Sequence, residues 1–390
     1  MKITAQFRTR IIVCFGLLLL LTPIMVFAQN RVVVIPIFGD DAKPLKNIIT
    51  VAKANGNFTD PVKAVNSIKD ASDKNPYLVV IGPGVYTITE SLVMQEYVDI
   101  AGSGENVTKI QGAISGSSDA SSAIISGANN AALSSLTVEN MGGSNNSRAI
   151  YNDYASPSLS NITVIASGGT FTTGILNDHS SPRMKHIIAL ASGGTYNHAV
   201  FNYYSSPTMI DLNATASGGT ENQGVYNSFS SCNMIDVTAS ASGGDKSHGV
   251  HNHRSSPTMI RVTATASAGT RSYAVYNYYS DAIMTDFTAT ASDGEYNRAV
   301  YNENSSPIIT ELTASALGGI NAYGVYNWPY SSPTIRRSTM KAPTGGLYMN
   351  DDTSAKVSQS TIIGGVSGPG TKTCVACDDG NGNALDANCE

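Results

Sequence analysis

The sequence predicts an all-β protein, a right-handed single-stranded parallel β-helix of 25-residue coils with a short N-terminal capping helix. The first supporting observation is a motif that returns every 25 residues, from Ala149-Ile-Tyr-Asn152 to Gly324-Val-Tyr-Asn327. The second is an alternation of apolar and small polar residues between the copies, and the third is a pair of turn motifs that bounds it. A fixed period of this length indicates stacked units that bury their apolar faces against one another.

The second half of each repeat has the pattern of a half-buried strand. A column of methionines, Met184 to Met284, is followed three residues on by Ile187, Leu212 and their equivalents, and then by small residues two and four further on. From the second column onward the spacing is two, with Thr or Ser between, and this period is typical of a strand. Ser-Ser-Pro and Gly-Gly close the two ends and predict turns.

The N-terminal segment, residues 1–28, has the pattern of a secretory signal peptide. Basic residues precede an apolar run around Leu17–Leu21, and Val26-Phe-Ala28 follows as a cleavage site. The run is short for a membrane span, and no later segment has the roughly 20 apolar residues that a span needs. Residues 29–45 are interpreted as a strand or linker. The sequence therefore predicts a secreted, periplasmic or cell-surface protein.

Composition narrows the possible partners. Charged residues make up 14% of the chain, and the net charge is −5. This balance offers no basic footprint for nucleic acid or for an anionic membrane surface. No cofactor is predicted, and the pattern does not set the oligomeric state.

Residues 46–112 predict the capping helix and the first coils. Asp60 can cap a helix that begins at Pro61, and Val62, Val65 and Ile68 then form an apolar stripe. Strands follow at 77–81, 97–104 and 107–112, with the turn Gly82-Pro-Gly-Val-Tyr86 between the first two. This order of helix, PGxY turn and GxG strand resembles the start of the pectin lyase-like superfamily, pectinesterases in particular. The resemblance implies a β-helix, continued here through repeats at 113–365.

The same resemblance stops short of an active site. Pectinesterases carry Gln-Asp-Thr-Leu and Asp-Phe-Ile-Phe-Gly motifs, whereas this chain has no Gln-Asp pair, and Asp286-Phe287 continues as Thr-Ala-Thr. No catalytic residue is therefore assigned. The six histidines occupy several different columns and do not suggest a triad. A divergent polysaccharide lyase or pectinesterase-like enzyme is the alternative hypothesis, since one fold hosts many functions.

One column of charged residues is a weak candidate for a metal site. Asp211 and Asp236 should lie on adjacent coils, where paired carboxylates could hold Ca²⁺. Arg261 follows in the same column, with Asp286 and Glu311 beyond it. A solvated ladder of mixed charges explains the column without a metal, so none is assigned.

The asparagine that ends each motif predicts a structural ladder. Its amide can bond the amides above and below, and Asn tolerates the left-handed backbone of a tight turn. The column consists of Asn152, Asn177, Asn202, Asn227, Asn252, Asn277, Asn302 and Asn327. Strict alternation would place the preceding Tyr inside the coil and the Ile or Val before it outside, but a bend in the strand would reverse this.

Aromatic residues stand in the turn just after most of the asparagines. Flat faces with polar edges can stack on sugar rings, so the predicted ligand-binding residues are Tyr154, Tyr204, Phe229, Tyr279 and Trp328. The alternative is that these large residues merely cover a corner of the solenoid. The predicted partner is a polysaccharide or cell-surface glycan, which would lie along the axis and stack on several rings.

The tail, 366–390, contains Cys374, Cys377 and Cys389. In an exported chain these predict one disulfide, from Cys389 to either Cys374 or Cys377, and a cap over the last coil. Cys232, inside the repeats, is expected to be buried and reduced.

A further alternative concerns a flat face of hydroxyl groups. Thr263-Ala-Thr265 and Thr288-Ala-Thr290 head a Thr/Ser ladder that could bind ice, although β-branched residues also simply suit strands. The preferred hypothesis is a β-helix with a structural or glycan-binding role and no recognisable catalytic site.

Overall fold

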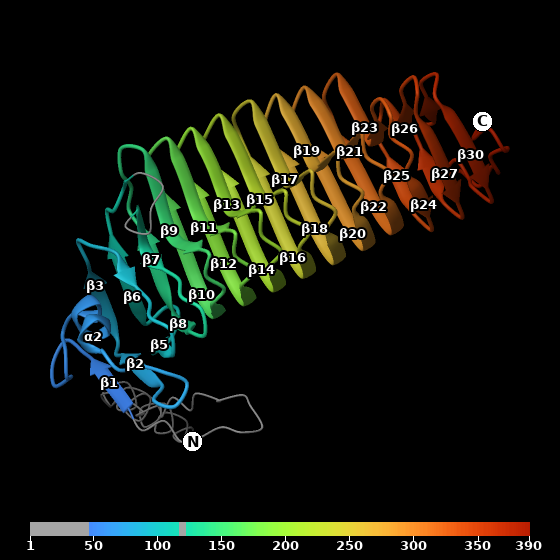
Figure 1. The fold of residues 1–390 in the computed structure, drawn as a ribbon. Helices are drawn as coiled ribbons and strands as arrows, with labels where there is room; N and C mark the ends of the chain where they lie inside the picture. The colour runs from blue at the N-terminus through green and yellow to red at the C-terminus, as the bar shows by residue number, and fades with distance from the viewer. Residues whose placement is uncertain (1–46, 117–121) are drawn as a thin grey trace, which may run out of the picture. The chain divides into compact units, whose positions relative to one another are not determined.

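A computed structural model of the chain describes residues 47–116 and 122–390. The predicted signal peptide and the segment 29–45 lie outside these residues. The described part confirms the predicted fold class, a right-handed parallel β-helix with one short helix (Figure 1). No helix in this part is long and apolar enough to cross a membrane.

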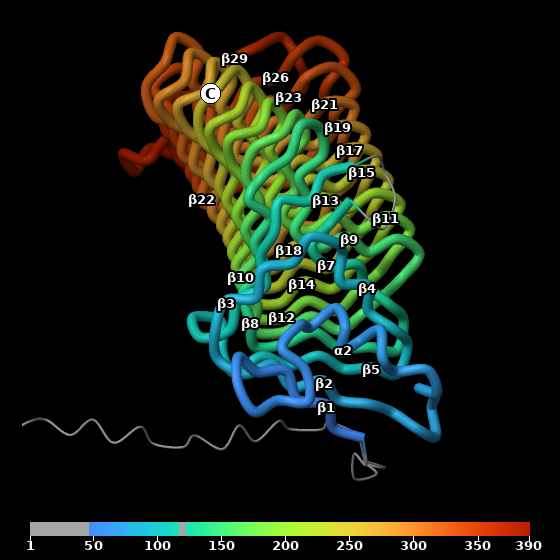
Figure 2. Tube along the Cα trace, turned by 90° about the vertical axis from the view of Figure 1, so that its left-hand side faces the viewer, coloured from blue at the N-terminus to red at the C-terminus, as the bar shows by residue number. Residues whose placement is uncertain are grey.

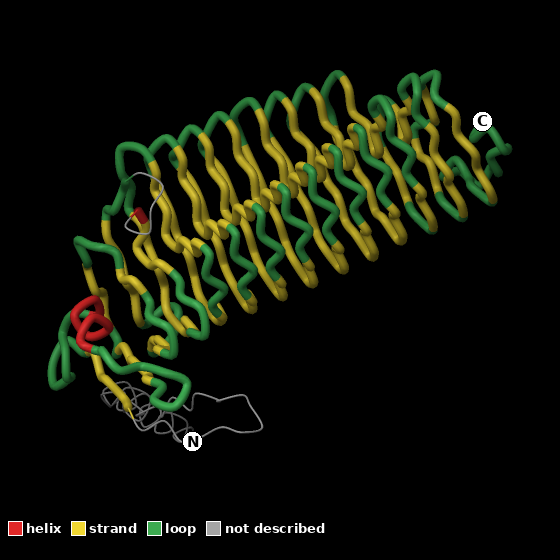
Figure 3. The backbone as a smooth tube through the Cα atoms, viewed as in Figure 1, coloured by secondary structure: helices red, strands yellow, loops and turns green. Residues whose placement is uncertain are grey.

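Two parallel sheets run the length of the solenoid (Figure 3). Each coil of the repeat region gives one strand to each sheet, and paired residues are equivalents one repeat apart, as in Asn202↔Asn227. In sheet 1 the repeat strands are β8 (Ala132–Asn140), β10 (Ser158–Ser167), β12 (Arg183–Ser192), β14 (Thr208–Ser217), β16 (Asn233–Ser242), β18 (Thr258–Ser267), β20 (Ile283–Ser292) and β22 (Ile308–Leu317). In sheet 2 they are β7 (Ala123–Ser126), β9 (Asn146–Asp153), β11 (Phe171–Asp178), β13 (Tyr196–Tyr203), β15 (Glu221–Ser228), β17 (Lys246–His253), β19 (Arg271–Tyr278), β21 (Tyr296–Glu303) and β23 (Asn321–Asn327).

The N-terminal end is closed by the helix α2 (Pro61–Ser67). The Asp60 side chain accepts hydrogen bonds from the backbone N–H groups of Val62 and Lys63, which caps the first turn. Val62 and Val65 are buried against the first coils. The strands here are β1 (Asn47–Val51), β2 (Tyr77–Ile81), β3 (Gly84–Thr87), β4 (Leu92–Val93), β5 (Val98–Gly102) and β6 (Thr108–Gly112).

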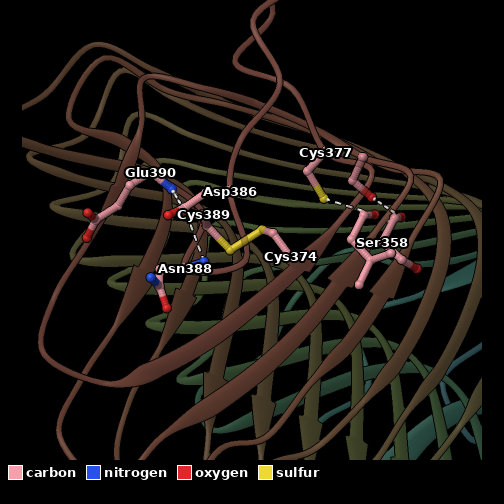
Figure 4. Close-up of a disulfide and its surroundings, with 9 residues drawn as sticks. Ser358, Cys374, Cys377, Asp386, Asn388, Cys389 and Glu390 are labelled. Atoms are coloured by element: carbon pink, nitrogen blue, oxygen red, sulfur yellow. Dashed lines mark hydrogen bonds between the residues drawn. A yellow bond between two sulfur atoms is a disulfide. The ribbon is translucent and has the colours of Figure 1, made fainter.

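A disulfide between Cys374 and Cys389 holds the C-terminal tail against the last coil (Figure 4). Cys374 also donates its backbone N–H to the carbonyl of Ala387 (3.0 Å). Cys377 and Cys232 are free thiols, both buried, and burial raises the pKa of Cys232 to about 12. The last strands are β24 (Thr334–Arg336), β25 (Thr339–Lys341), β26 (Gly345–Met349), β27 (Ser354–Ser358), β28 (Thr361–Ile363), β29 (Val366–Ser367) and β30 (Thr371–Val375).

The interior of the coils is a stack of like residues. The methionine column, the Ile, Leu, Val and Phe column after it, and the Ala columns are buried in one continuous core. Like side chains one coil apart keep van der Waals contact along the axis, which is how a solenoid buries its apolar surface. The two sheets face each other across this core, and the turns between them align in rows (Figure 2).

A bend in sheet 2 decides which motif residues face inward. Ala149 and Ile150 are consecutive, yet both belong to the interior core. Pairing between coils is interrupted at this point, running from Thr173↔His198 directly to Ile175↔Val200. The alternation therefore changes phase, so the Ile or Val faces inward and the next residue outward. The sequence left the side of the Tyr column open, and this bend places the column on the outer face.

The asparagine column forms an unbroken ladder of side-chain hydrogen bonds inside the solenoid. Each Nδ2 donates to the Oδ1 of the next coil, from Asn152 to Asn177 (2.7 Å) through to Asn302 and Asn327 (2.9 Å). All eight asparagines are fully buried. They lie in strands, and the left-handed backbone belongs to the second residue after each of the first seven and to the third residue after Asn327. Asparagine is therefore needed here for the hydrogen bonds of its side-chain amide and not for its tolerance of a left-handed backbone.

Candidate functional site

The turn that follows each asparagine is fixed by its serines. Ser205 accepts the backbone N–H of Ser180 on its hydroxyl oxygen (2.8 Å) and donates that hydroxyl to the carbonyl of Tyr203 (2.8 Å). The second serine of each Ser-Ser-Pro motif bonds in the opposite direction, since Ser206 N–H donates to Ser181 Oγ (3.0 Å). The first serines donate their N–H groups to the next coil, and the second serines donate theirs to the previous coil, so each turn is joined to both neighbours. The turns are consequently held in register, one per coil.

The second residue after each of the first seven asparagines, together with Tyr330, the third residue after Asn327, forms what we call the aromatic turn column. Its members are Tyr154, His179, Tyr204, Phe229, Arg254, Tyr279, Asn304 and Tyr330, and every one has a positive φ, between 45° and 60°. A left-handed backbone costs a non-glycine residue about 1–2 kcal/mol. Tyr154, Tyr204 and Tyr279 are nevertheless 69%, 48% and 50% exposed. Large side chains at strained, exposed positions call for a compensating interaction.

That interaction is stacking between coils. The ring centroids of Tyr154 and His179 lie 4.6 Å apart, those of His179 and Tyr204 5.2 Å, and those of Tyr204 and Phe229 4.8 Å, with interplanar angles of 7–12°. The Arg254 guanidinium continues the stack, 5.4 Å from the Phe229 ring and 5.9 Å from that of Tyr279. Each aromatic pair contributes about 0.5–1.5 kcal/mol, which roughly offsets the backbone strain.

This geometry changes the way the column can contact a ligand. The flat faces of the inner rings are covered by neighbouring rings, so a chain lying along the axis cannot stack on them one after another. What remains accessible is the outer edge of each ring, including the phenol hydroxyls of Tyr154, Tyr204 and Tyr279. Such edges donate and accept hydrogen bonds, as the hydroxyl groups of a sugar do.

Behind the turn, the outer face of sheet 2 carries a second aromatic surface. Phe201, Tyr226, His251, Tyr276 and Tyr301 stack in sequence with centroid distances of 4.7–4.9 Å. A row of His and Tyr side chains from the other side of the bend packs over them, as His248 does at 5.1 Å from His251. Residues on both sides of a concave bend converge, which explains why outward-facing rings such as Tyr273 and Tyr301 are buried.

The histidines in this surface are held neutral. The ring nitrogens of His248 and His251 are buried and have no hydrogen-bond partner among the residues that the structure describes. Burial lowers the pKa of His198 to about 4. Burial, with Lys246 and Arg271 nearby, lowers the pKa of His248 to about 3, and burial also places that of His251 well below its ordinary value. They serve as packing side chains at neutral pH.

The two weak candidates for a metal site, Asp211 and Asp236, each contact a different basic side chain. Asp211 contacts Nδ1 of His186, whereas Asp236 accepts two bonds from the Arg261 guanidinium (2.6 and 2.9 Å). This arginine lowers the pKa of Asp236. No cluster of three His, Cys, Asp or Glu side chains with metal-binding geometry occurs among residues 47–116 and 122–390.

The Thr/Ser ladder lies on the outer face of sheet 1. Pairing places Asn213, Thr238, Thr263, Thr288 and Thr313 in one row, with Thr215, Ser240, Thr265, Thr290 and Ser315 in the next. The side chains are exposed or half-buried. The two rows form an uncharged hydroxyl surface on the opposite sheet from the aromatic residues.

Two features escaped the sequence analysis. Tyr330, rather than Trp328, occupies the aromatic turn column, because one extra residue around Pro329 shifts the step between serines to 26. That longer step, visible in the spacing of the Ser-Ser-Pro motifs, was the available signal. The second feature is an inner polar column at the Gly-Gly turn. Asn197 there accepts from Gly194 N–H (2.9 Å) and donates to Asn222 Oδ1 (2.9 Å).

No known family model matches the chain, and no curated protein sequence does. Solved structures do. Tailspike protein 2 from the Escherichia coli O157:H7 bacteriophage CAB120 matches with a TM-score of 0.53 at 12% identity, over 75% of this chain and 43% of the tailspike. The catalytic domain of a GH87 α-1,3-glucanase, in complex with tetrasaccharides, matches with a TM-score of 0.52 at 11% identity, over 87% of this chain and 70% of that domain.

The chain shares the parallel β-helix fold with the tailspike and the glucanase domain. A pectin methylesterase from carrot is also matched, at 9% identity over 85% of each chain, but its TM-score of 0.30 is too low to argue from. At these identities the likeness concerns the fold alone. The chain spans less than half the length of the tailspike, so activity and partners have to be argued from its own residues.

Proposed function

We propose that this protein is an exported β-helix that binds a polysaccharide or cell-surface glycan along the aromatic turn column. The observation that carries the proposal is the exposed column itself, with large side chains kept at left-handed positions on successive coils. Covering a corner does not require rings at such strained positions, because Gly or Asn would adopt the same backbone at lower cost.

Binding would use ring edges rather than ring faces. Tyr154, Tyr204 and Tyr279 offer phenol hydroxyls, and the column repeats at the strand spacing of about 4.8 Å. Each hydrogen bond to a sugar hydroxyl is weak by itself, contributing about 0.5–1.5 kcal/mol. Several bonds to one chain act together, so affinity would rise steeply with glycan length. Glycan-related proteins of the same fold, such as the glucanase crystallised with tetrasaccharides, make this partner class a reasonable choice.

The first test is a glycan array with the purified protein, followed by calorimetric titration of any hit. The triple variant Tyr154→Phe, Tyr204→Phe, Tyr279→Phe keeps the stacked rings and removes only hydroxyls. We expect it to bind at least tenfold more weakly. Tyr196→Phe, at a ring that stacks on Phe171 (5.0 Å) outside the column, serves as the matched control. Equal binding by the triple variant and the parent would show that the column only covers the turn.

A second test removes rings. Replacing Tyr204 and Phe229 together with Ala takes out one adjacent stacked pair. We expect the double variant to bind more weakly than either single variant. A reducing-end assay on pectin and alginate tests the enzymatic alternative at the same time, since product release would indicate catalysis.

Ice binding is a second candidate, favoured by the two uncharged rows on sheet 1. Their hydroxyls repeat regularly in two directions, along the strand and from coil to coil. Thermal hysteresis of the purified protein tests it, with Thr263→Lys and Thr288→Lys as disrupting variants. An absence of hysteresis in the parent would exclude this role.

A further inference from the structure

The aromatic turn column is interrupted at one coil. Asn304 occupies the position between Tyr279 and Tyr330, and all three residues have the same left-handed backbone. Their coils are consecutive, because Tyr279 N–H donates to Glu303 O (3.0 Å) and Asn304 N–H donates to Pro329 O (3.2 Å). The short Asn304 side chain therefore leaves a gap in a row that large side chains otherwise fill. We call this gap the Asn304 slot.

Both walls of the slot are aromatic. Tyr279 is 50% exposed, with Arg254 on its other side, and Tyr330 is 68% exposed. No other aromatic ring contacts Tyr330 among the described residues, whereas the Tyr279 ring lies edge-on to that of Tyr278, with the centroids 4.6 Å apart. Two coils span about 9.6 Å. Contact distances of about 3.5–4.0 Å on each side leave roughly 2 Å for the thickness of a puckered ring between the walls.

Two consecutive polar residues, Glu303 and Asn304, stand at the coil where the slot occurs. Oε2 of the half-buried Glu303 accepts hydrogen bonds from the hydroxyls of Tyr276 (2.7 Å) and Tyr301 (3.0 Å), which fixes the carboxylate. No hydrogen bond to its Oε1 occurs among the described residues. The Asn304 amide makes no side-chain hydrogen bond within the described part of the chain, so it can donate and accept. Vicinal sugar hydroxyls match this pair of groups.

The charge at the base selects against acids. Glu303 would repel a uronate carboxylate or a sulfate group, because like charges at close range disfavour binding. The two arginines on this side of the coils, Arg254 and Arg298, stack on aromatic rings. Arg254 lies beyond the Tyr279 ring, and Arg298 lies over the rings of Tyr326 and Tyr301, at 3.7 and 4.4 Å.

We propose that the Asn304 slot binds one neutral pyranose unit of a glycan, with Tyr279 and Tyr330 against its two faces and Glu303 and Asn304 bonded to its hydroxyls. This inference rests on the proposed function and deepens it by naming the kind of sugar. Along the stacked part of the column a ligand meets only ring edges, whereas the slot presents two faces. The slot would therefore select the type of sugar, and the rest of the aromatic turn column would add affinity for the neighbouring sugar units.

The test is to fill the slot. Asn304→Tyr introduces the residue that neighbouring coils carry at this position, so the fold should be kept or stabilised. Titration with neutral gluco-, manno- and galacto-oligosaccharides should show at least a tenfold loss of affinity relative to the parent. Asn213→Tyr, the same substitution at an exposed position on the outer face of sheet 1, is the matched control and should stay within about twofold. Unchanged melting curves verify that both variants fold.

Charge selectivity is tested with Glu303→Gln. This variant should bind neutral oligosaccharides several-fold more weakly and oligouronates more strongly than the parent does. If the parent binds glycans and Asn304→Tyr binds them equally well, the slot is wrong while the proposed function stands. If the parent prefers uronates, the neutral class is wrong. If the parent binds none of the glycans, both the proposed function and the slot are overturned.

Discussion

The outer faces of sheets 1 and 2 belong to the same coils, yet they differ in almost every respect. Sheet 1 presents exposed or half-buried Thr, Ser and Asn side chains in flat rows, as at Asn213 and Thr238. Sheet 2 presents Tyr, Phe and His side chains that pack over one another, and several are as buried as core residues. The difference lies in the backbone. Sheet 2 bends at Ala149 and Ile150, and side chains on the two sides of this concave bend converge.

The two sheets differ in whether the sequence pattern reveals which side chains face inward. In sheet 1 the sequence itself shows the break in alternation, since the methionine stands three residues before the next core residue. The second of the two residues between them has a left-handed backbone, as Asp211 does. In sheet 2 the break falls between two apolar residues, so nothing in the pattern marks it. Four predictions test this difference, beginning with the largest effect.

The first prediction concerns the corner of sheet 2. Val225→Asp should lower the free energy of unfolding by about 3–5 kcal/mol, because an unpaired charge would be buried in the core. Tyr226→Asp, one residue later on the outer face, should cost clearly less. Urea unfolding measures both. If the two costs were reversed, the tyrosines would face inward after all.

The second prediction concerns acid. His198 and His248 have pKa values of about 4 and 3 in the folded protein, below the value of about 6.5 expected for unfolded chains. Their neutral packing is therefore fully stabilising above pH 6.5, and stability should fall as the pH drops from 6.5 toward 4. At about 1.4 kcal/mol per pH unit for each group, the loss should reach several kcal/mol.

The matched variant for the acid prediction is His248→Tyr, which copies Tyr273 of the next coil. Melting temperatures between pH 7 and pH 4 should depend less on pH in this variant than in the parent. A pH dependence identical to that of the parent would mean that His248 is protonated in both states.

The third prediction compares asparagines inside and outside. Asn227→Leu should destabilise the protein by about 1–3 kcal/mol, because it leaves Asn202 and Asn252 without their ladder partners. Asn213→Leu, on the exposed face of sheet 1, should change stability by less than about 0.5 kcal/mol. Thermal unfolding of the two variants provides the measurement, and equal effects would refute the ladder's contribution.

The fourth and smallest effect concerns the turn. Tyr204→Ala should cost about 1–2 kcal/mol, because it loses two stacking contacts and keeps the left-handed strain. Tyr204→Gly should be close to neutral, since glycine adopts that backbone without penalty. Chemical denaturation can resolve the difference. Equal stability of the two variants would mean that the backbone at this position is not strained.

The sequence by itself determined the coil and its contents. These features are either local or strictly repeated. They are the 25-residue period without insertions, the turn residues Ser-Ser-Pro and Gly-Gly, and the capping signal at Asp60 and Pro61. Repeated features predict the structure reliably because each coil is stacked on a copy of itself. The choice between Cys374 and Cys377 as the partner of Cys389 was left open, because it depends on how the tail folds back.

Only the tertiary structure decided where the rings point and what covers them. The bend at Ala149 and Ile150 reversed the inward and outward sides of the Tyr column, and stacking between coils closed the faces of Tyr204 and Phe229 that the sequence had offered to a ligand. Neither could be derived from one repeat, since both depend on contacts with the neighbouring coil. The gap at Asn304 has the same origin, because a small residue becomes a slot only when large side chains stand above and below it.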